Sequence, residues 1–163
     1  QGEHMIAHTL ELKYGSELHN VMHGELIAIT ALTMSQFQHR VLLTTPVLRP
    51  MPYALENFDR LFGKQHGINL ANAYAEKLLT AECAEEINGR IGTRWLEIKH
   101  ALTEIMLPTN TLERAFIHSG MHTNASQIGL EDERYRFATS YAHLTRERFT
   151  FLDLAAMGVK RLR

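Results

Sequence analysis

The sequence predicts an all-α fold, a multi-helix bundle of about seven to nine helices. Apolar residues recur at spacings of three and four through most of the 163 residues, which is the spacing of one helix face. No segment alternates apolar and polar residues as a half-buried strand does, and the chain shows no internal repeat. Glycine and proline residues divide the helical pattern into segments of ordinary helix length.

The first two predicted helices carry the clearest patterns. A first helix is expected over residues 3–14, and Gly15 ends it, as glycine commonly does after a last helical turn. Its apolar stripe consists of Ile6, Leu10 and Tyr14. After a loop over 15–21, a second helix is expected over 22–43. Apolar residues surround most of its circumference, so we expect it to be buried among other helices.

The later elements are separated by proline-rich or glycine-containing segments. Pro46, Pro50 and Pro52 make residues 44–52 a connector, since proline disrupts both helices and strands. The remaining predictions, in chain order, are a helix over 53–62 ending at Gly63, helices over 69–77 and 80–106 (the second one broken near Gly89 or Gly92), a stop at Pro108, a short helix from Asn110 or Thr111 to His118 ending at Ser119 and Gly120, a polar loop over 121–129, and helices over 130–146 and 150–157.

Composition limits the function classes. A length of 163 residues, with 45% hydrophobic and 21% charged residues, fits one globular domain with a substantial core. The net charge of −1 gives no general attraction to nucleic acid, so we expect no nucleic-acid partner. One cysteine, Cys83, excludes an internal disulfide framework and fits a reducing compartment, and no apolar run is long enough for a membrane span. A cytoplasmic location is expected.

Ten histidines are many for this length, and four of them lie close together in the sequence: His4, His8, His19 and His23. The others are scattered, and we interpret them as surface or satisfied polar residues. On a helix, the spacing of four places the imidazoles of His4 and His8 on one face, one turn apart. That spacing allows both rings to approach one metal ion or one ligand.

His23 precedes the second predicted helix, in the segment Met22-His23-Gly24-Glu25. Gly24 removes a side chain beside this imidazole, which allows a ligand to approach closely. A catalytic zinc ion takes three protein ligands, and the third is not evident among these residues. Glu3, Glu11 and Glu25 are nearby in sequence, and Glu3 and Glu25 could instead hold the imidazoles in place. The pattern therefore indicates an incomplete metal site.

Three segments resemble the C-terminal domain of the dehydroquinate synthase-like superfamily, which includes glycerol dehydrogenases, iron-containing alcohol dehydrogenases and glycerol-1-phosphate dehydrogenases. Gly2-Glu3-His4-Met5-Ile6-Ala7-His8 resembles the family's Gly-x-Glu-His-x-x-x-His helix, and Met22-His23-Gly24-Glu25 resembles its His-Gly-Glu motif. Residues 146–155 are similar to the ending of glycerol-1-phosphate dehydrogenases, and residues 107–130 also look similar. The resemblance covers nearly the whole chain, from Gly2 to about Gly158.

The resemblance implies specific roles. His4 and His23 would be metal ligands, for zinc or another divalent metal, and His8 would contact the substrate and act in catalysis. The third ligand, an aspartate, and the glycine-rich loop that binds NAD(P) would belong to an N-terminal nucleotide-binding domain. We find neither in this sequence, so residues 1–163 are expected to form only the helical half, inactive on its own, with NAD(P) bound only by the full-length parent.

The resemblance further implies hydride transfer between a nicotinamide cofactor and a small polyol phosphate, interconverting glycerol-1-phosphate and dihydroxyacetone phosphate. Arg146, Arg148 and the amides at the start of the second helix are candidates for binding the phosphate, with surface ion pairing as the alternative for the arginines. Another superfamily member, such as a glycerol dehydrogenase or a sugar-phosphate cyclase, is a competing interpretation. A second competing interpretation is a stand-alone helical module that binds a metal or a partner, and a third is a superfamily member that kept the fold and lost the activity. The sequence is also compatible with a homodimer.

Overall fold

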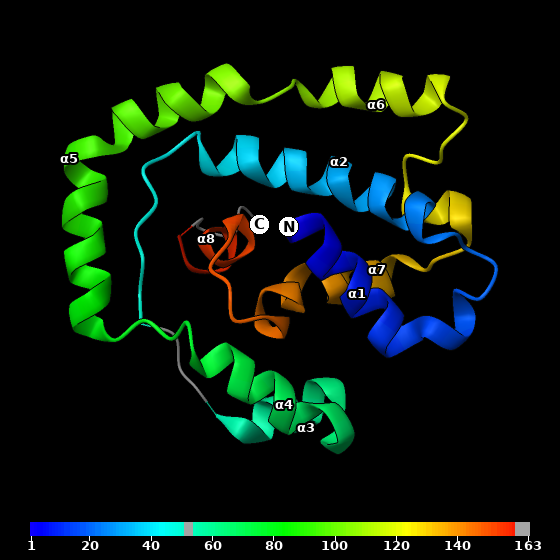
Figure 1. Cartoon of the computed structure of the whole chain (residues 1–163), viewed down its shortest axis with the longest axis horizontal. Helices are drawn as coiled ribbons and strands as arrows, with labels where there is room; N and C mark the ends of the chain where they lie inside the picture. The colour runs from blue at the N-terminus through cyan, green and yellow to red at the C-terminus, as the bar shows by residue number, and fades with distance from the viewer. Residues whose placement is uncertain (51–53, 159–163) are drawn as a thin grey trace.

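A computed structural model describes residues 1–50 and 54–158 of the chain (Figure 1), and these residues form helices joined by loops, with no strand. The prediction of an all-α multi-helix bundle is confirmed. The α-helices are α1 (Gly2–Tyr14), α2 (His23–Val41), α3 (Leu55–Phe62), α4 (Lys64–Ala75), α5 (Ala81–Ile105), α6 (Thr109–His118), α7 (Asp132–Tyr141) and α8 (Phe151–Gly158), and the short 3-10 segments are η1 (Gly15–Glu17), η2 (Ala125–Ile128) and η3 (Ala142–Thr145).

Helices α1 and α2 form the centre of the main core. Ile6, Ala7 and Leu10 on α1 are fully buried, which confirms the predicted apolar stripe through Ile6 and Leu10. Helix α2 contacts α1, α6 and α8, so it lies among other helices, as its apolar circumference predicted (Figure 1). The two helices approach closely at the start of α1, where a Cβ atom on Gly2 would lie 2.5 Å from Cε of Met34.

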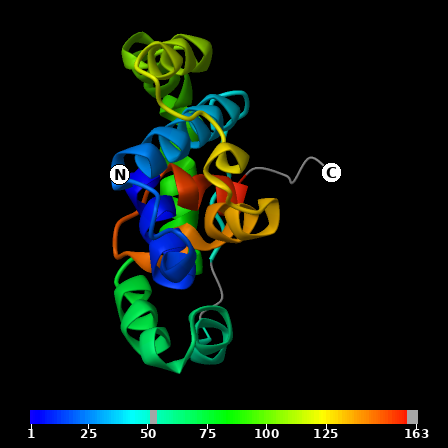
Figure 2. The same cartoon turned by 90° about the vertical axis from the view of Figure 1, so that its right-hand side faces the viewer.

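Helices α3 and α4 form a hairpin at one end of the molecule, away from α6 (Figure 2). The predicted end of α3 at Gly63 is confirmed, but α4 begins at Lys64 rather than at the predicted residue 69. Gly63 has a φ of 80°, so one residue turns the chain directly from α3 into α4. Gly67 lies inside α4, where the helix passes close to α3. A side chain would not fit at this position, because a Cβ atom would come within 3.1 Å of the Asp59 backbone.

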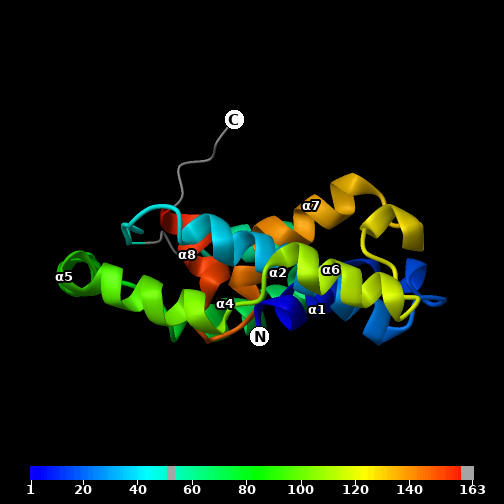
Figure 3. The same ribbon diagram turned by 90° about the horizontal axis from the view of Figure 1, so that it is seen from above.

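Helix α5 leads away from the core. A short non-helical segment over 106–108 then connects it to α6, which runs beside α2 (Figure 3). Its hydrogen bonding is continuous over Ala81–Ile105, so the predicted break near Gly89 or Gly92 is wrong, although the helix bends visibly (Figures 1 and 3). Trp95 anchors α5 by packing in a small cluster with Val41 and Leu42.

Other boundaries differ by smaller amounts. The predicted helix over 130–146 divides into α7 and η3, and the predicted loop over 121–129 contains η2. Pro108 precedes the first residue of α6, Thr109, so Asn110 and Thr111, the two predicted starts of this helix, already lie inside it. Pro52 and Tyr53, at the junction of two predicted elements, lie outside the described residues. No helix in the described ranges has both the length and the apolar character needed to cross a membrane.

A buried ion pair joins Lys77, which follows the end of α4, to Asp153 in the first turn of α8. Nζ of Lys77 lies 2.7 Å from Oδ1 of Asp153, and their side chains are only 3% and 0% exposed. Lys77 also donates to the carbonyl oxygens of His143 and Arg148. The other carboxylate oxygen of Asp153 accepts from the backbone N–H of Thr150, 2.7 Å away, at the start of α8. The segment between η3 and α8 is therefore fixed at both ends.

We predict that Lys77→Met destabilises the fold by about 3–5 kcal/mol, because it leaves the Asp153 carboxylate buried without its cation. Urea unfolding would measure the loss. The exposed Lys64→Met is the matched control and should change the free energy of unfolding little. The double variant Lys77→Met with Asp153→Asn removes both charges and keeps the cap on α8, so it should be more stable than Lys77→Met alone. If Lys77→Met were as stable as the control Lys64→Met, the role of this ion pair would be contradicted.

The second prediction concerns His143, whose pKa burial lowers to about 4, with Asp153 opposing and Lys77 adding to the effect. The unfolded chain takes up a proton near pH 6.5 while folded His143 stays neutral, so stability should fall as the pH drops from 6.5 toward 4. The loss from this group is at most about 3 kcal/mol. In His143→Gln this part of the pH dependence should disappear, whereas the exposed His100→Gln should retain it. Urea unfolding at several pH values measures both, and parallel curves for wild type and His143→Gln would refute the assignment.

Candidate functional site

The imidazoles of His4, His8 and His23 lie together between α1 and the first turn of α2. Their ring centroids are 6.1 Å apart for His4 and His8, 5.9 Å for His4 and His23, and 5.5 Å for His8 and His23. His4 and His8 come from one face of α1, as their spacing of four predicted, and His23 is the first residue of α2. The side chains are 52%, 44% and 48% exposed, so the cluster opens to the surface.

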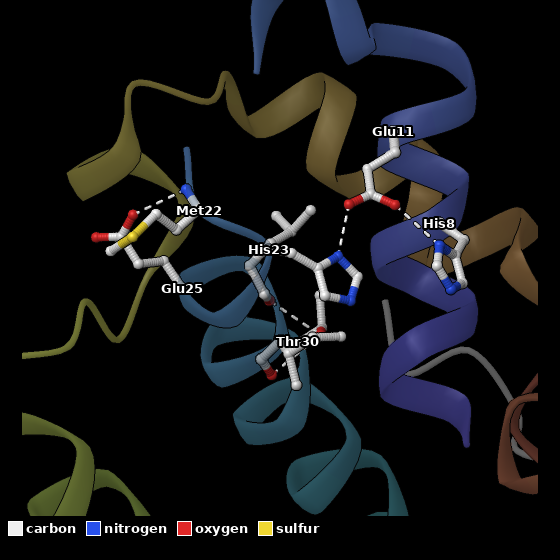
Figure 4. Close-up of polar contacts among 8 residues, drawn as sticks. His8, Glu11, Met22, His23, Glu25 and Thr30 are labelled. Carbon is white, nitrogen blue, oxygen red and sulfur yellow. Dashed lines mark hydrogen bonds and ion pairs between the residues drawn. The ribbon is translucent and has the colours of Figure 1, made fainter. Parts of the chain in front are cut away.

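Carboxylates hold the same nitrogen of each ring. Glu11 on α1 bridges two rings: its Oε2 lies 2.8 Å from Nδ1 of His8 and its Oε1 lies 2.7 Å from Nδ1 of His23 (Figure 4). Oε1 of Glu3 lies 3.1 Å from Nδ1 of His4. An ionised carboxylate can only accept hydrogen bonds, so each Nδ1 carries the proton and each neutral ring keeps its lone pair on Nε2.

The electrostatics of Glu11 agree with this arrangement. Burial raises the pKa of the Glu11 carboxyl, but the hydrogen bonds from His23 and His8 and the electrostatic attraction of these two residues together outweigh burial, and the pKa lies below its ordinary value. Glu11 is therefore ionised at neutral pH. In Figure 4 the rings of His8 and His23 turn one nitrogen toward this carboxylate and the other away from it.

Glu25 does not hold an imidazole of this cluster, although the sequence suggested that role. Its Oε2 accepts from the backbone N–H of Met22 at the start of α2, and its Oε1 lies 3.0 Å from Nδ1 of His122. Figure 4 shows its side chain on the opposite side of the helix start from Glu11. His19 is also outside the cluster. Its Nδ1–H donates a hydrogen bond to the carbonyl oxygen of Ser16 instead.

Two open hollows adjoin the cluster and meet at His8 and Arg146. The first, about 450 Å³, is lined by Gln1, Glu3, His4, Met5, His8, Arg146, Glu147 and Arg148. The second, about 430 Å³, is lined by His8, Glu11, Leu12, Leu70, Thr145 and Arg146. Arg148 pairs with Glu147 at 3.3 Å, which is the surface pairing considered for it, whereas Arg146 forms no ion pair with any described carboxylate. Gly24, beside His23, has open space around it, since a Cβ atom there would meet nothing within 4 Å.

The three ring separations, 5.5–6.1 Å, can be compared with the spacing of two imidazoles that share one metal ion. Two imidazoles that bind a tetrahedral zinc ion at about 2.0–2.1 Å have ring centroids roughly 5 Å apart. The separation of His4 and His23 is slightly wider, at 5.9 Å, and His8 lies at similar distances from both. Ring spacing alone therefore does not distinguish a ligand from a substrate-binding residue. Within the described ranges, no group of three or more His, Cys, Asp or Glu side chains could hold a metal ion, so a complete site needs further ligands.

Sequence reasoning missed the central role of Glu11. From the sequence, Glu11 counts only among the nearby carboxylates that could supply a third metal ligand, and the imidazole-holding role is an alternative for Glu3 and Glu25 alone. The spacing of three between His8 and Glu11 was a usable signal, because residues three apart are neighbours on a helix surface. The second contact, to His23, depends on how α2 packs against α1, which local spacing does not show.

Comparison with known proteins identifies no relative: no family model matches the chain, and neither a curated protein nor a solved structure is significantly similar to it. The features of the chain that bear on its function are therefore the geometry of the His4, His8 and His23 cluster and the motifs that contain these residues.

Proposed function

We propose that this chain is the metal- and substrate-binding half of an NAD(P)-dependent dehydrogenase that interconverts glycerol-1-phosphate, or a similar polyol phosphate, and dihydroxyacetone phosphate. The observation that carries the proposal is the meeting of three imidazoles, from α1 and α2, beside an open hollow. The third metal ligand and the nicotinamide cofactor would come from a nucleotide-binding domain outside this sequence. The enzyme would work in the cytoplasm.

In this proposal His4 and His23 bind a zinc ion, or another divalent metal, through Nε2. When bound, the metal acts as a Lewis acid that stabilises the alkoxide form of the substrate alcohol. Glu3 and Glu11 orient the two rings by accepting from their Nδ1–H groups, which is the usual arrangement around metal-bound histidines. Because Nδ1 of each ring donates to a carboxylate, the lone pair of each ring would be on Nε2, the atom that would bind the metal.

His8 contacts the substrate and handles its proton. During alcohol oxidation, Nε2 of His8 would accept the hydroxyl proton, and a nicotinamide cofactor, when bound, would supply the hydride-accepting chemistry. In the reverse direction, His8 returns a proton to the oxygen of the reduced ketone. Since His8 lines both hollows and is 44% exposed, it can exchange this proton with water.

Among the residues that the structure describes, Arg146 is the one best placed to bind the substrate phosphate. It lines the same two hollows as His8, and no described carboxylate lies within ion-pair distance of it, although its charge helps to lower the pKa of the neighbouring Glu147. A guanidinium group binds phosphate oxygens through parallel hydrogen bonds, so it would fix the end of the substrate away from the reacting carbon. Dependence of the activity on the phosphate group would separate this proposal from a glycerol dehydrogenase.

Metal content tests the assignment of His4 and His23. We expect the full-length protein to retain zinc, and His4→Ala or His23→Ala to lose it, because each variant removes one of few ligands. Elemental analysis of the purified proteins measures the metal directly. His100→Ala, at an exposed position on α5, is the control and should keep its zinc. Retention of metal in both site variants would remove the basis of the proposal.

A separate measurement tests the role of His8. In His8→Asn, we expect kcat/KM for the reduction of dihydroxyacetone phosphate to fall by about 10²–10⁴-fold, the usual contribution of a positioned acid or base. Zinc content should remain unchanged. If the metal were lost with His8, this residue would be a ligand and its assignment to the substrate would be wrong.

A further inference from the structure

Glu11 is the only point at which a single described side chain joins two rings of the cluster. The carboxylate projects from α1 and contacts His8 on its own helix and His23 on α2, at 2.8 and 2.7 Å (Figure 4). Other carboxylates nearby have different partners: Glu3 contacts His4, Glu17 pairs with Arg134, and Glu25 caps α2.

The shared contact has a specific chemical consequence. Each imidazole must place its proton on Nδ1 to donate to Glu11, so both rings adopt the same tautomer. Their Nε2 atoms, which Figure 4 shows turned away from Glu11, are then unprotonated and can accept a proton or bind a metal. A histidine side chain in water prefers the other tautomer, with its proton on Nε2, in which it could not bind a metal or accept a proton through that atom.

We propose that Glu11 is a positioning residue that fixes both His8 and His23 in the Nδ1–H tautomer and thereby prepares both nitrogens at once. For the use of those nitrogens, one in metal binding and one in proton transfer, this inference rests on the proposed function. The tautomers themselves do not depend on it. One carboxylate thus serves the residue assigned to the metal and the residue assigned to the substrate.

The test is the ring tautomer, read from the ¹⁵N chemical shifts of the histidine nitrogens of the metal-free chain at a pH where the rings are neutral. In the wild-type protein we expect the Nδ1–H form for both His8 and His23. In Glu11→Ala both rings should move toward the Nε2–H form, and in Glu11→Gln at most one ring should keep the original form, because an amide has a single acceptor oxygen. Circular dichroism would verify that the variants fold.

Glu104→Gln is the matched control, because Glu104 faces His100 on the exposed side of α5, at 3.6 Å, and should leave the His8 and His23 signals unchanged. Unaltered tautomers in Glu11→Ala would overturn the inference. Zinc titration of the same proteins is the second measurement, and we expect a 10–100-fold loss of affinity in Glu11→Ala. If His23→Ala abolished zinc binding while Glu11→Ala did not weaken it, the positioning role would be refuted. If tautomers changed but none of the histidine variants affected zinc, the metal assignment would fail and the role of Glu11 in fixing the tautomers would stand.

Discussion

The burial of one face of α1 is the constraint on which the cluster depends. Ile6, Ala7 and Leu10 are fully excluded from solvent, so α1 cannot rotate about its axis without exposing apolar side chains. This fixes the opposite edge of the helix, where His4, His8 and Glu11 follow one another at intervals of about one turn. The start of α2 lies beside that edge and adds His23. The imidazoles are thus brought together by ordinary core packing, and the polar contacts only orient them.

The second determinant of the site is the anchoring of the loop after η3. Lys77 and Asp153 are an ion pair in the interior, and Lys77 also takes two backbone carbonyls as partners. A paired and hydrogen-bonded charge is tolerated inside a protein, whereas an unpaired one is not. The loop that carries Arg146 to the hollow beside His8 is therefore held by contacts that lie behind it. Residues far from the imidazoles in sequence shape the side of the hollow opposite to α1.

The sequence was a good guide where structure follows from local pattern. The helical class, the end of α3 at Gly63 and the burial of α2 arise from residue spacing and backbone preference, whereas Gly15 keeps a right-handed helical conformation (φ −57°) and leads from α1 directly into η1. The grouping of His4 and His8 follows in the same way, while their roles stay predictions. What could not be predicted depends on distant packing. Gly67 lies inside α4 at a point where Asp59 leaves no room for a side chain, and Glu11 rather than Glu25 reaches His23 because of the way α1 and α2 meet. No local signal distinguishes these outcomes.

The closeness of the cluster in sequence also bears on how the protein folds. Glu11 and His23 are separated by only 12 positions, so bringing them together closes a short loop at a small cost in chain entropy. The contact between Lys77 and Asp153 closes a far longer one. Short-range contacts of this kind tend to form rapidly, since little of the chain has to be ordered first. The arrangement therefore favours an order of assembly in which the imidazoles and their carboxylates meet early, before the C-terminal segment completes the wall of the hollow.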